Sequence, residues 1–270
     1  MVFECEETSK KDWLKIKIPN PNSHKGQNGI LLIIAGSKTY FGSVFFSLKA
    51  AVRFCDIVYV FSPENKKFIQ KLKIDPNIIV IDHSKLNQII QKSDAFLIGP
   101  GLEDKNKTRK ILEKILKTKK PVVLDALAIK LANKKFFGSN IVLTPHKKEF
   151  EETFKIKATF SNACKIAKKF NIVLILKGRH DLICSKNNCK INKTGNAGMT
   201  KGGSGDCLAG LCAALLTKNE PFVSACASAF LNGLTADKLF KKYSYYYTSE
   251  QLATQLALVA TKIYSKKKRK

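Results

Sequence analysis

Short apolar runs alternate with longer amphipathic stretches over the first two thirds of the 270-residue chain. The runs are rich in isoleucine, leucine and valine, a composition typical of buried strands. Eight strands are predicted, at Ile30–Ala35, Ile57–Phe61, Ile78–Ile81, Ala95–Gly99, Val122–Asp125, Ile141–Thr144, Ile172–Lys177 and Leu182–Ser185. Helices are expected between them, for example at Ser43–Arg53, Lys107–Thr118 and Ala163–Phe170. Continuous apolar strands separated by helices favour a parallel sheet that is covered on both faces.

After Gly205 the pattern contains helical stretches only, which are predicted at Asp206–Leu216, Pro221–Phe240 and Ser249–Tyr264. The predicted fold class is therefore α/β, a doubly wound and mostly parallel sheet with helices on both faces and a helical C-terminal third. We expect an N-terminal extension over residues 1–22, a single domain over residues 23–265 and a basic tail over residues 266–270.

Glycine and polar residues follow most of the predicted strands. In doubly wound sheets ligands bind beyond the carboxyl ends of the strands, so these residues are expected to meet at one rim. The segments are Ala35-Gly36-Ser37, Gly99-Pro100-Gly101, Asp125-Ala126, Thr144-Pro145-His146, Lys177-Gly178 and the polar run from Thr194 to Asp206.

The strongest chemical signal is Gly202-Gly203-Ser204-Gly205-Asp206, which leads directly into an apolar helix. Glycines let backbone N–H groups approach an anion, and a helix N-terminus adds unpaired donors and a positive dipole. Such a site suits a transferred phosphoryl group, and Asp206 is placed to accept a proton from an attacking hydroxyl. The alternative is that Asp206 only caps the helix. The glycine cluster favours the functional interpretation.

Other local motifs are weaker. Gly36-Ser37-Lys38-Thr39 lacks the glycine spacing of a P-loop, and Gly203-x-Gly205 lacks the third glycine of a dinucleotide fingerprint. His146 alone reads as an exposed loop residue and Asp125 as a helix cap. Lys177, at a strand end, is placed to meet phosphates.

Taken together, these segments resemble the NAD(P)H-hydrate dehydratase family of the ribokinase-like superfamily. The resemblance is carried by His24-Lys25-Gly26 with Gly29, and then by LLIIAGSKTYFGS, IGPGLE, VVLDALAI, VLTPHKKEF, LKGRHDLIC and TGNAGMTKGGSGDCLAGLCAALL, in family order. It implies a repair enzyme that returns hydrated NADH or NADPH to the working cofactor, with ADP or ATP as co-substrate and Mg²⁺. The ring hydroxyl would be phosphorylated and phosphate, a better leaving group than hydroxide, would then depart.

The resemblance also implies roles for individual residues. It places catalysis on Asp206 and on the anion hole of Ser204 and Gly205. The substrate-binding residues that it implies are Gly42, Ser43, Gly101, His146, Asn196 and Asp206, and the nucleotide-binding residues are Lys177, Gly178, Arg179, His180, Asp181 and Gly205. It assigns no metal ligand. Ser43 replaces a usual alanine, and Asp181 replaces a usual small residue beside the nucleotide.

The family resemblance further suggests a homo-oligomer, a tetramer, and it leaves the choice between ADP and ATP open. About 22 residues precede His24, so we expect the epimerase activity found in many relatives to come from a separate protein. The alternative function is a ribokinase-like kinase acting on a pyrimidine or thiazole alcohol through the same anion site.

Composition excludes several other classes. Apolar residues make up 44% and charged residues 26% of the chain, which indicates a globular protein. No apolar run reaches the roughly 18 residues of a membrane helix, and no secretory signal opens the chain. The eight cysteines form no Cys-x-x-Cys motif, and no histidine lies at ligand spacing from a cysteine. Neither disulfides nor structural zinc are therefore expected. A reducing, cytoplasmic location is the corresponding expectation.

The chain carries 48 Lys and Arg against 21 Asp and Glu, a net charge of +27, which raises the hypothesis of nucleic-acid binding. Only Arg53, Arg109, Arg179 and Arg269 are arginines, although arginine is the preferred reader of phosphates and bases. The lysines are spread along the chain, as expected for solvated faces and for attraction of small anionic ligands.

The charge pattern therefore predicts no specific nucleic-acid site. Nonspecific DNA binding is expected with dissociation constants of about 10⁻⁴ to 10⁻⁶ M at physiological salt, falling steeply as salt rises. Titration of labelled duplexes at several salt concentrations measures this. Sequence-selective nanomolar binding at physiological salt would contradict the prediction.

Overall fold

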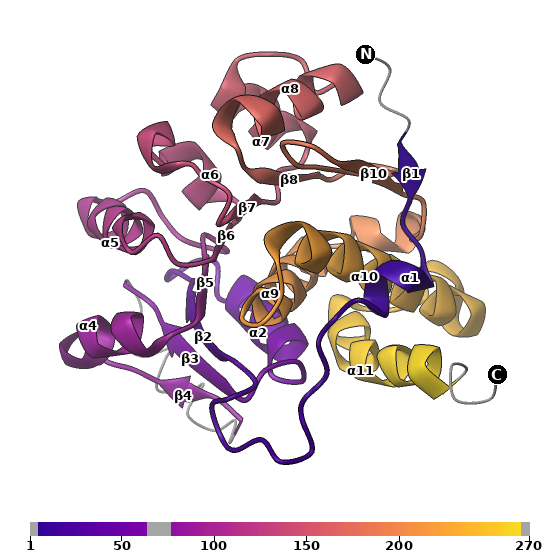
Figure 1. Ribbon diagram of the computed structural model, residues 1–270, viewed down its shortest axis with the longest axis horizontal. Helices are drawn as coiled ribbons and strands as arrows, with labels where there is room; N and C mark the ends of the chain where they lie inside the picture. The colour runs from indigo at the N-terminus through magenta and orange to yellow at the C-terminus, as the bar shows by residue number, and fades with distance from the viewer. Residues whose placement is uncertain (1–4, 64–76, 266–270) are drawn as a thin grey trace.

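The computed structural model describes residues 5–63 and 77–265, so the predicted basic tail lies outside the described residues. Its strands form one sheet (Figure 1). Across the sheet the order is β1 (Glu6–Glu7), β10 (Cys189–Asn192), β9 (Asp181–Cys184), β8 (Val173–Leu176), β7 (Ile141–Leu143), β6 (Val122–Leu124), β5 (Ala95–Ile98), β2 (Ile30–Ile34), β3 (Ile57–Phe61) and β4 (Ile79–Val80). Within this sheet only β9 pairs antiparallel with its neighbours, which confirms the mostly parallel α/β prediction.

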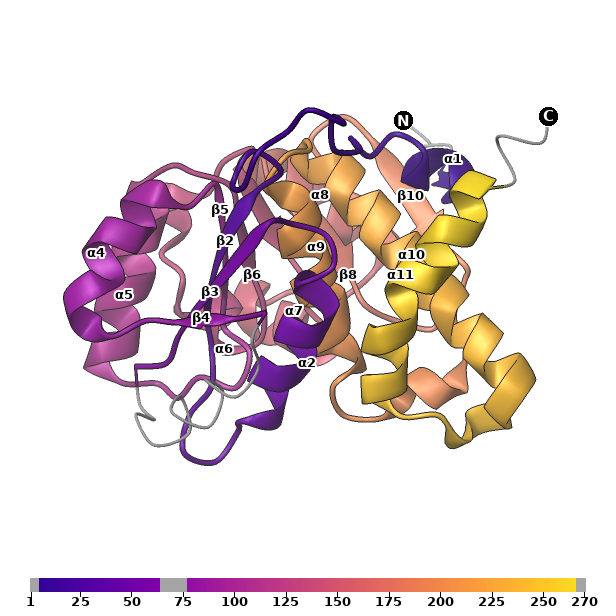
Figure 2. The same cartoon turned by 90° about the horizontal axis from the view of Figure 1, so that it is seen from below.

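Helices cover both faces of the sheet (Figures 1 and 2). One face carries α4 (His83–Lys92), α5 (Asn106–Lys117), α6 (Leu127–Leu131), α7 (Lys147–Phe154) and α8 (Phe160–Phe170). The other carries α2 (Gly42–Ala51), α9 (Ser204–Leu216) and α10 (Pro221–Tyr243), with α11 (Ser249–Ser265) and α1 (Lys10–Trp13) outside them. Short 3₁₀ turns complete the chain at Lys134–Phe136, Ala197–Thr200 and Ser244–Tyr246.

The alternation of side chains along β2 explains why this strand is apolar at every position. Leu32 and Ile34 face the α4–α8 side, whereas Leu31 and Ile33 face α2 and α9, and all four are fully buried. A strand buried on both faces needs no polar positions. The same argument holds for the other central strands that the sequence predicted.

The C-terminal third is helical, as predicted, and its helices form two layers on one face of the sheet. Leu208 and Cys212 of α9 pack against the sheet, while Leu211 and Leu215 pack against α10 and α11. Every residue of α9 from Cys207 onward is buried, as expected of a helix that is apolar on all sides. None of the described helices combines the length and the apolarity needed to cross a bilayer.

The predicted strands are confirmed to within one or two residues at each end, but β1 and β10 were not predicted. Strand β10 reads Cys-Lys-Ile-Asn and β1 is only Glu-Glu, so neither has an apolar run. They form because each pairs with a neighbouring strand at the edge of the sheet.

Helices α2 and α9 cross at unusually close range. A Cβ atom on Gly210 would lie 2.2 Å from the carbonyl oxygen and 2.7 Å from the Cα of Ser47. One turn along, the Ser47 hydroxyl donates to the backbone oxygen of Asp206 at 3.2 Å. Glycine at 210 therefore allows the backbones of the two helices to touch.

Replacing Gly210 by alanine is expected to destabilise the fold by about 1–3 kcal/mol, because the added methyl group meets backbone rather than a movable side chain. Chemical denaturation measures the change. Gly202→Ala is the matched control, since nothing lies within 4 Å of a Cβ at that position. Equal unfolding free energies for the two variants would contradict the tight crossing.

Candidate active site

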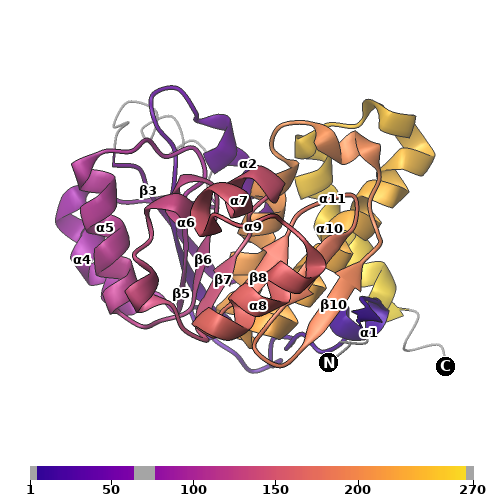
Figure 3. The same cartoon turned by 90° about the horizontal axis from the view of Figure 1, so that it is seen from above.

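The segments that follow the strands converge at the carboxyl edge of the sheet, as predicted. The Lys177 amide donates to the Pro145 carbonyl at 2.8 Å, and the Gly36 amide donates to the Pro100 carbonyl at 2.8 Å. Figure 3 shows α2, α7 and α9 close together at this edge. The rim is therefore one continuous surface built from several loops.

A buried ion pair lies at the centre of this rim. The Lys177 ammonium lies 3.1 Å from Oδ1 of Asp125, and the Thr144 hydroxyl donates to the same oxygen at 2.6 Å. Burial alone would lower the pKa of Lys177, but Asp125, Glu149 and Asp206 outweigh it and the pKa is raised. The lysine therefore stays charged and presents a fixed positive group.

Asp206 lies in the first turn of α9, on the side facing α2. Burial and the nearby Asp125 raise its pKa to about 6, and Glu149 adds to the rise, while Lys177 and a hydrogen bond from the Ser43 hydroxyl oppose it. A carboxylate with a pKa near neutrality is mostly ionised at pH 7 yet still able to take up a proton. Asp206 is thus suited to act as a general base.

The turn before α9 requires glycine at one position. Gly203 has φ of 100°, and a Cβ there would lie 2.4 Å from the ring of Phe46 on α2. The Ser204 hydroxyl donates to the carbonyl of Met199 and so fixes the turn. The amides of Gly205 and Asp206 lie in the first helical turn, where the helix supplies no acceptor. These backbone groups form the candidate anion site.

A cavity of about 370 Å³ opens beside the anion site. Most of the predicted nucleotide residues line it, namely Lys177, Gly178, Arg179, Asp181 and Gly205, together with Ser204 and Asn196. A Cβ on Gly205 would lie 3.4 Å from the Lys177 ammonium, so that charge lies over the anion site. His180 is exposed and does not line the cavity.

The Asp181 carboxylate accepts hydrogen bonds from neighbouring protein groups. Its carboxylate accepts from the Gly178 amide at 3.1 Å and from the Asn192 side chain at 3.2 Å. Burial raises its pKa in spite of these hydrogen bonds. The additional carboxylate thus closes the turn between β8 and β9 rather than projecting unbonded toward the cavity.

Asn196, predicted to contact the substrate, anchors one wall of the same cavity. Its side-chain oxygen accepts from the Tyr247 hydroxyl at 2.8 Å and from the Gly198 amide at 3.0 Å. Its amide group donates to Asp237 at 3.0 Å. These bonds connect the loop to α10 and to the segment before α11.

The remaining predicted substrate residues lie outside that cavity. His146 caps α7, since its Nδ1 accepts from the Glu149 amide at 3.1 Å. Gly42 and Ser43 begin α2. Gly101, with φ of 63°, passes so close to the Tyr40 carbonyl that a Cβ would lie 2.3 Å from it. The Ser43 hydroxyl reaches Asp206, which places the start of α2 at the reacting group.

Sequence reasoning did not assign roles to Glu149 and Thr144. Glu149 acts on the pKa of both Lys177 and Asp206, and Thr144 bonds Asp125. The spacing of His146 and Glu149 fits a capping box, which is a signal for the helix start but not for the electrostatic role.

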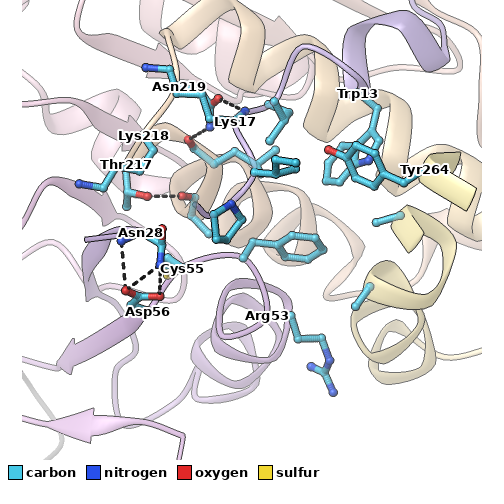
Figure 4. Close-up of a pocket in the computed structure, with 18 of the residues that line it drawn as sticks. Trp13, Lys17, Asn28, Arg53, Cys55, Asp56, Thr217, Lys218, Asn219 and Tyr264 are labelled. Carbon is cyan, nitrogen blue, oxygen red and sulfur yellow. Dashed lines mark hydrogen bonds between the residues drawn. The ribbon is translucent and has the colours of Figure 1, made fainter. Parts of the chain in front are cut away.

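A larger cavity, of about 460 Å³, lies near the amino ends of β2 and β3 (Figure 4). Asp56 accepts there from the amides of Gly26 and Asn28, so the His24-Lys25-Gly26 segment belongs to this edge. Ligands of such sheets bind at the carboxyl edge. The anion site and its raised carboxylate pKa, rather than cavity size, therefore locate the candidate active site.

The fold places the chain among proteins with a ribokinase-like fold. A ribokinase-like superfamily protein from Enterococcus faecalis superposes with a TM-score of 0.87 and 24% identity over 97% of this chain and 98% of that chain. The ADP/ATP-dependent NAD(P)H-hydrate dehydratase from Bacillus subtilis, co-crystallised with ATP and Mg²⁺, superposes with a TM-score of 0.85 and 23% identity over 97% of this chain and 100% of that chain. At these identities the likeness shows the fold alone.

Within that class, the chain belongs to the NAD(P)H-hydrate dehydratase family, whose model matches residues 31–258. A bifunctional NAD(P)H-hydrate repair enzyme from Methanocaldococcus jannaschii is 40% identical over 247 residues, which cover 87% of this chain and 48% of that protein. An ADP-dependent (S)-NAD(P)H-hydrate dehydratase from Nitrosopumilus maritimus is 34% identical over 264 residues, which cover 88% of this chain and 90% of that protein. The chain spans about half the length of the bifunctional relatives.

Asp125→Asn is expected to destabilise the protein by about 3 kcal/mol, because it leaves the Lys177 charge buried without its partner. The value lies at the low end for buried pairs, since the lysine side chain keeps 20% exposure. Denaturant unfolding measures it. The control is Glu152→Gln, which removes an exposed pair with Lys148 and should change stability by less than about 1 kcal/mol. Equal losses in both variants would contradict the burial argument.

Proposed function

We propose that this protein dehydrates hydrated NADH and NADPH, with ADP or ATP as phosphoryl donor. The observation that carries the proposal is Asp206, a carboxylate with a pKa of about 6 in the first turn of a glycine-led anion-binding helix. A base beside an anion hole is what transfer of a phosphoryl group to a hydroxyl requires. Membership of the family supports the choice of substrate.

In the first step Asp206 takes the proton of the ring hydroxyl as the hydroxyl oxygen attacks the terminal phosphoryl group of the nucleotide. The bond from that phosphorus to the bridging oxygen breaks, and AMP leaves from ADP or ADP leaves from ATP. The amides of Gly205 and Asp206 stabilise the charge on the phosphoryl oxygens, and Lys177 adds a positive group over the same place. In the second step the carbon–oxygen bond breaks and phosphate leaves. A proton leaves the neighbouring carbon, and the ring double bond forms again.

Asp125 positions Lys177 rather than reacting. Its carboxylate is 3% exposed and bonded to both Lys177 and Thr144. Because the lysine is held at a fixed distance, little reorganisation is needed when charge develops in the transition state.

The residues of the rim fit a magnesium ion. Asp125 and Glu149 both raise the pKa of Asp206, so negative charge accumulates where nucleotide phosphates would lie. Magnesium prefers oxygen ligands, keeps several waters and is bound by one or two carboxylates with substrate phosphates. No metal ligand is assigned among the described residues, so the ion would be held through the nucleotide phosphates, and its contribution when bound would be to offset their charge.

The proposal extends to the surroundings of the enzyme. The family resemblance supports a homotetramer, and an epimerase is expected to act on the same hydrated cofactor. A cytoplasmic location is part of the same proposal, since a reducing compartment keeps cysteines as thiols. The choice between ADP and ATP is settled by measuring turnover with each.

The proposal is tested by following recovery of NADH absorbance from purified hydrated NADH, with ADP or ATP and Mg²⁺. A thiazole alcohol and a pyrimidine alcohol are offered in parallel, with phosphorylated product measured by mass spectrometry. Nucleotide-dependent recovery of NADH supports the proposal. Phosphorylation of an alcohol without NADH recovery would replace it by the kinase alternative.

Asp206→Asn is expected to lower turnover by about 10²- to 10⁴-fold, the usual cost of losing a positioned general base. Nucleotide affinity, measured by calorimetry, should stay close to that of the wild type, because the carboxylate acts on the chemical step. A variant that keeps more than half of wild-type turnover would contradict the assignment.

The acid limb of kcat/KM for hydrated NADH is expected near pH 6, since protonated Asp206 no longer accepts a proton. The Ser43 hydroxyl lowers this pKa, so Ser43→Ala should move the limb to higher pH. Ser47→Ala is the control, because Ser47 bonds the backbone oxygen of Asp206 instead of its carboxylate. A limb that stays in place in Ser43→Ala would show that Asp206 does not control it.

A further inference from the structure

Four of the eight cysteines meet at one end of the sheet, where Cys5 joins three cysteines from residues 164–189. This thiol cluster consists of Cys5, Cys164, Cys184 and Cys189. The Sγ–Sγ distance is 3.2 Å between Cys184 and Cys189, and Cys164 lies 3.5 and 3.6 Å from them. Cys5 lies 3.5 Å from Cys189. The four sulfurs are thus in contact as one group.

The fold brings each sulfur from a different element. Cys184 ends β9 and Cys189 begins β10, and the two are paired residues in the antiparallel register. Cys164 lies on the buried side of α8, which packs over β8 and β9 (Figure 3). Cys5 precedes β1, whose Glu6 pairs with Lys190, so the parallel register brings Cys5 beside Cys189 (Figure 1).

The donor set of the cluster is chemically uniform. Its three inner thiols are the one group of three or more histidine, cysteine, aspartate or glutamate side chains that converges within the described part of the chain. They are at most 8% exposed and belong to the apolar core under α8. Sulfur ligands in a dry site select soft or borderline metals such as zinc, and disfavour magnesium and calcium.

The distances among the three inner sulfurs are close to those of a tetrahedral zinc site. With zinc–sulfur bonds of about 2.3 Å, the sulfurs of such a site lie about 3.8 Å apart. The contacts among the three inner sulfurs are a few tenths of an ångström shorter, so small movements of these side chains would make room for the ion. Cys5 contacts Cys189 but lies outside the group of sulfurs that are all within 4.8 Å of one another, so its side chain would have to turn toward Cys164 and Cys184 to complete the tetrahedron. Cys5 is half-buried at the edge of the cluster, which gives a metal a way in from solvent.

Plain packing accounts less well for this arrangement. A thiol is a weak hydrogen-bond donor and acceptor, so four of them in contact gain little from one another. Cys207, Cys212 and Cys226 show the usual alternative, since each packs as a small apolar side chain in the helical layers. A disulfide between Cys184 and Cys189 would use two sulfurs and leave the other two without a role.

We propose that the thiol cluster binds a zinc ion through its four sulfurs. On binding, each thiol gives up its proton and forms one zinc–sulfur bond, so loading releases protons and weakens as pH falls. The ion would fasten β1, a strand of only two residues, to α8 and to the β9–β10 hairpin. Its role is therefore structural, and it lies apart from Asp206 and the anion site.

The full-length chain, without an affinity tag and purified without chelator under reducing conditions, is the material for the test. Inductively coupled plasma mass spectrometry should give one zinc per chain. Cobalt exchanged into the site should show the strong visible absorption of a tetrahedral cobalt thiolate. Removal of zinc should lower the Tm by several degrees and speed amide exchange over residues 5–16.

Cys164→Ala should lose the zinc and the cobalt spectrum, whereas Cys212→Ala, which removes a fully buried thiol of α9, should keep both. Cys5→Ser tests the same site at its exposed edge and does not disturb the core. It should weaken zinc binding by more than the roughly 10- to 100-fold that loss of an outer-shell partner costs.

Two results would overturn the proposal. One is wild-type protein that binds no zinc when reduced and whose thiols react with a thiol reagent at the same rate with and without zinc. The other is a Cys184–Cys189 disulfide found by mass spectrometry in freshly isolated protein. Iron or copper at one ion per chain would retain the sulfur site and overturn the choice of zinc.

Discussion

The contact between α2 and α9 is the constraint on which the candidate active site depends. Gly210 lets the two backbones touch at Ser47, and the same face of α2 then supplies the next contacts toward the start of α9. Ser47 bonds the backbone of Asp206, Phe46 lies against Gly203, and Ser43 reaches the Asp206 carboxylate. A shift of either helix would therefore alter the anion site and the general base together.

The electrostatics of the rim follow from this packing. Asp206 has a raised pKa because α2 and the loops around Asp125 and Glu149 exclude water from it and add negative charge. Lys177 has a raised pKa because it faces the same carboxylates. Clustered carboxylates favour the protonated form of a neighbouring group, so they raise both pKa values. The protonated form is neutral for Asp206 and positively charged for Lys177. The site thus holds both a base and a fixed cation, each only partly exposed to solvent.

The sequence predicted those parts of the molecule that depend on local pattern. Strands such as Ile57–Phe61 were predicted because both of their faces are buried, and Asp206 was assigned from its glycine-led helix start. The edge strands β1 and β10 were missed, since their pairing partners rather than their own residues make them strands. The contact of Ser43 with Asp206 was likewise hidden, because it joins two helices more than 150 residues apart in sequence.

The cysteines show the same limit most clearly. Zinc was not expected from the sequence because no Cys-x-x-Cys occurs, and the closely spaced Cys184 and Cys189 supply only two ligands, with Cys164 twenty residues before them. In the fold, a hairpin and a covering helix bring these sulfurs to within 3.6 Å of one another. Spacing along the chain is evidence for a site only when one local element supplies all the ligands. When a sheet edge supplies them, strand register decides which residues meet, and β10 acquires its register only by pairing with β9.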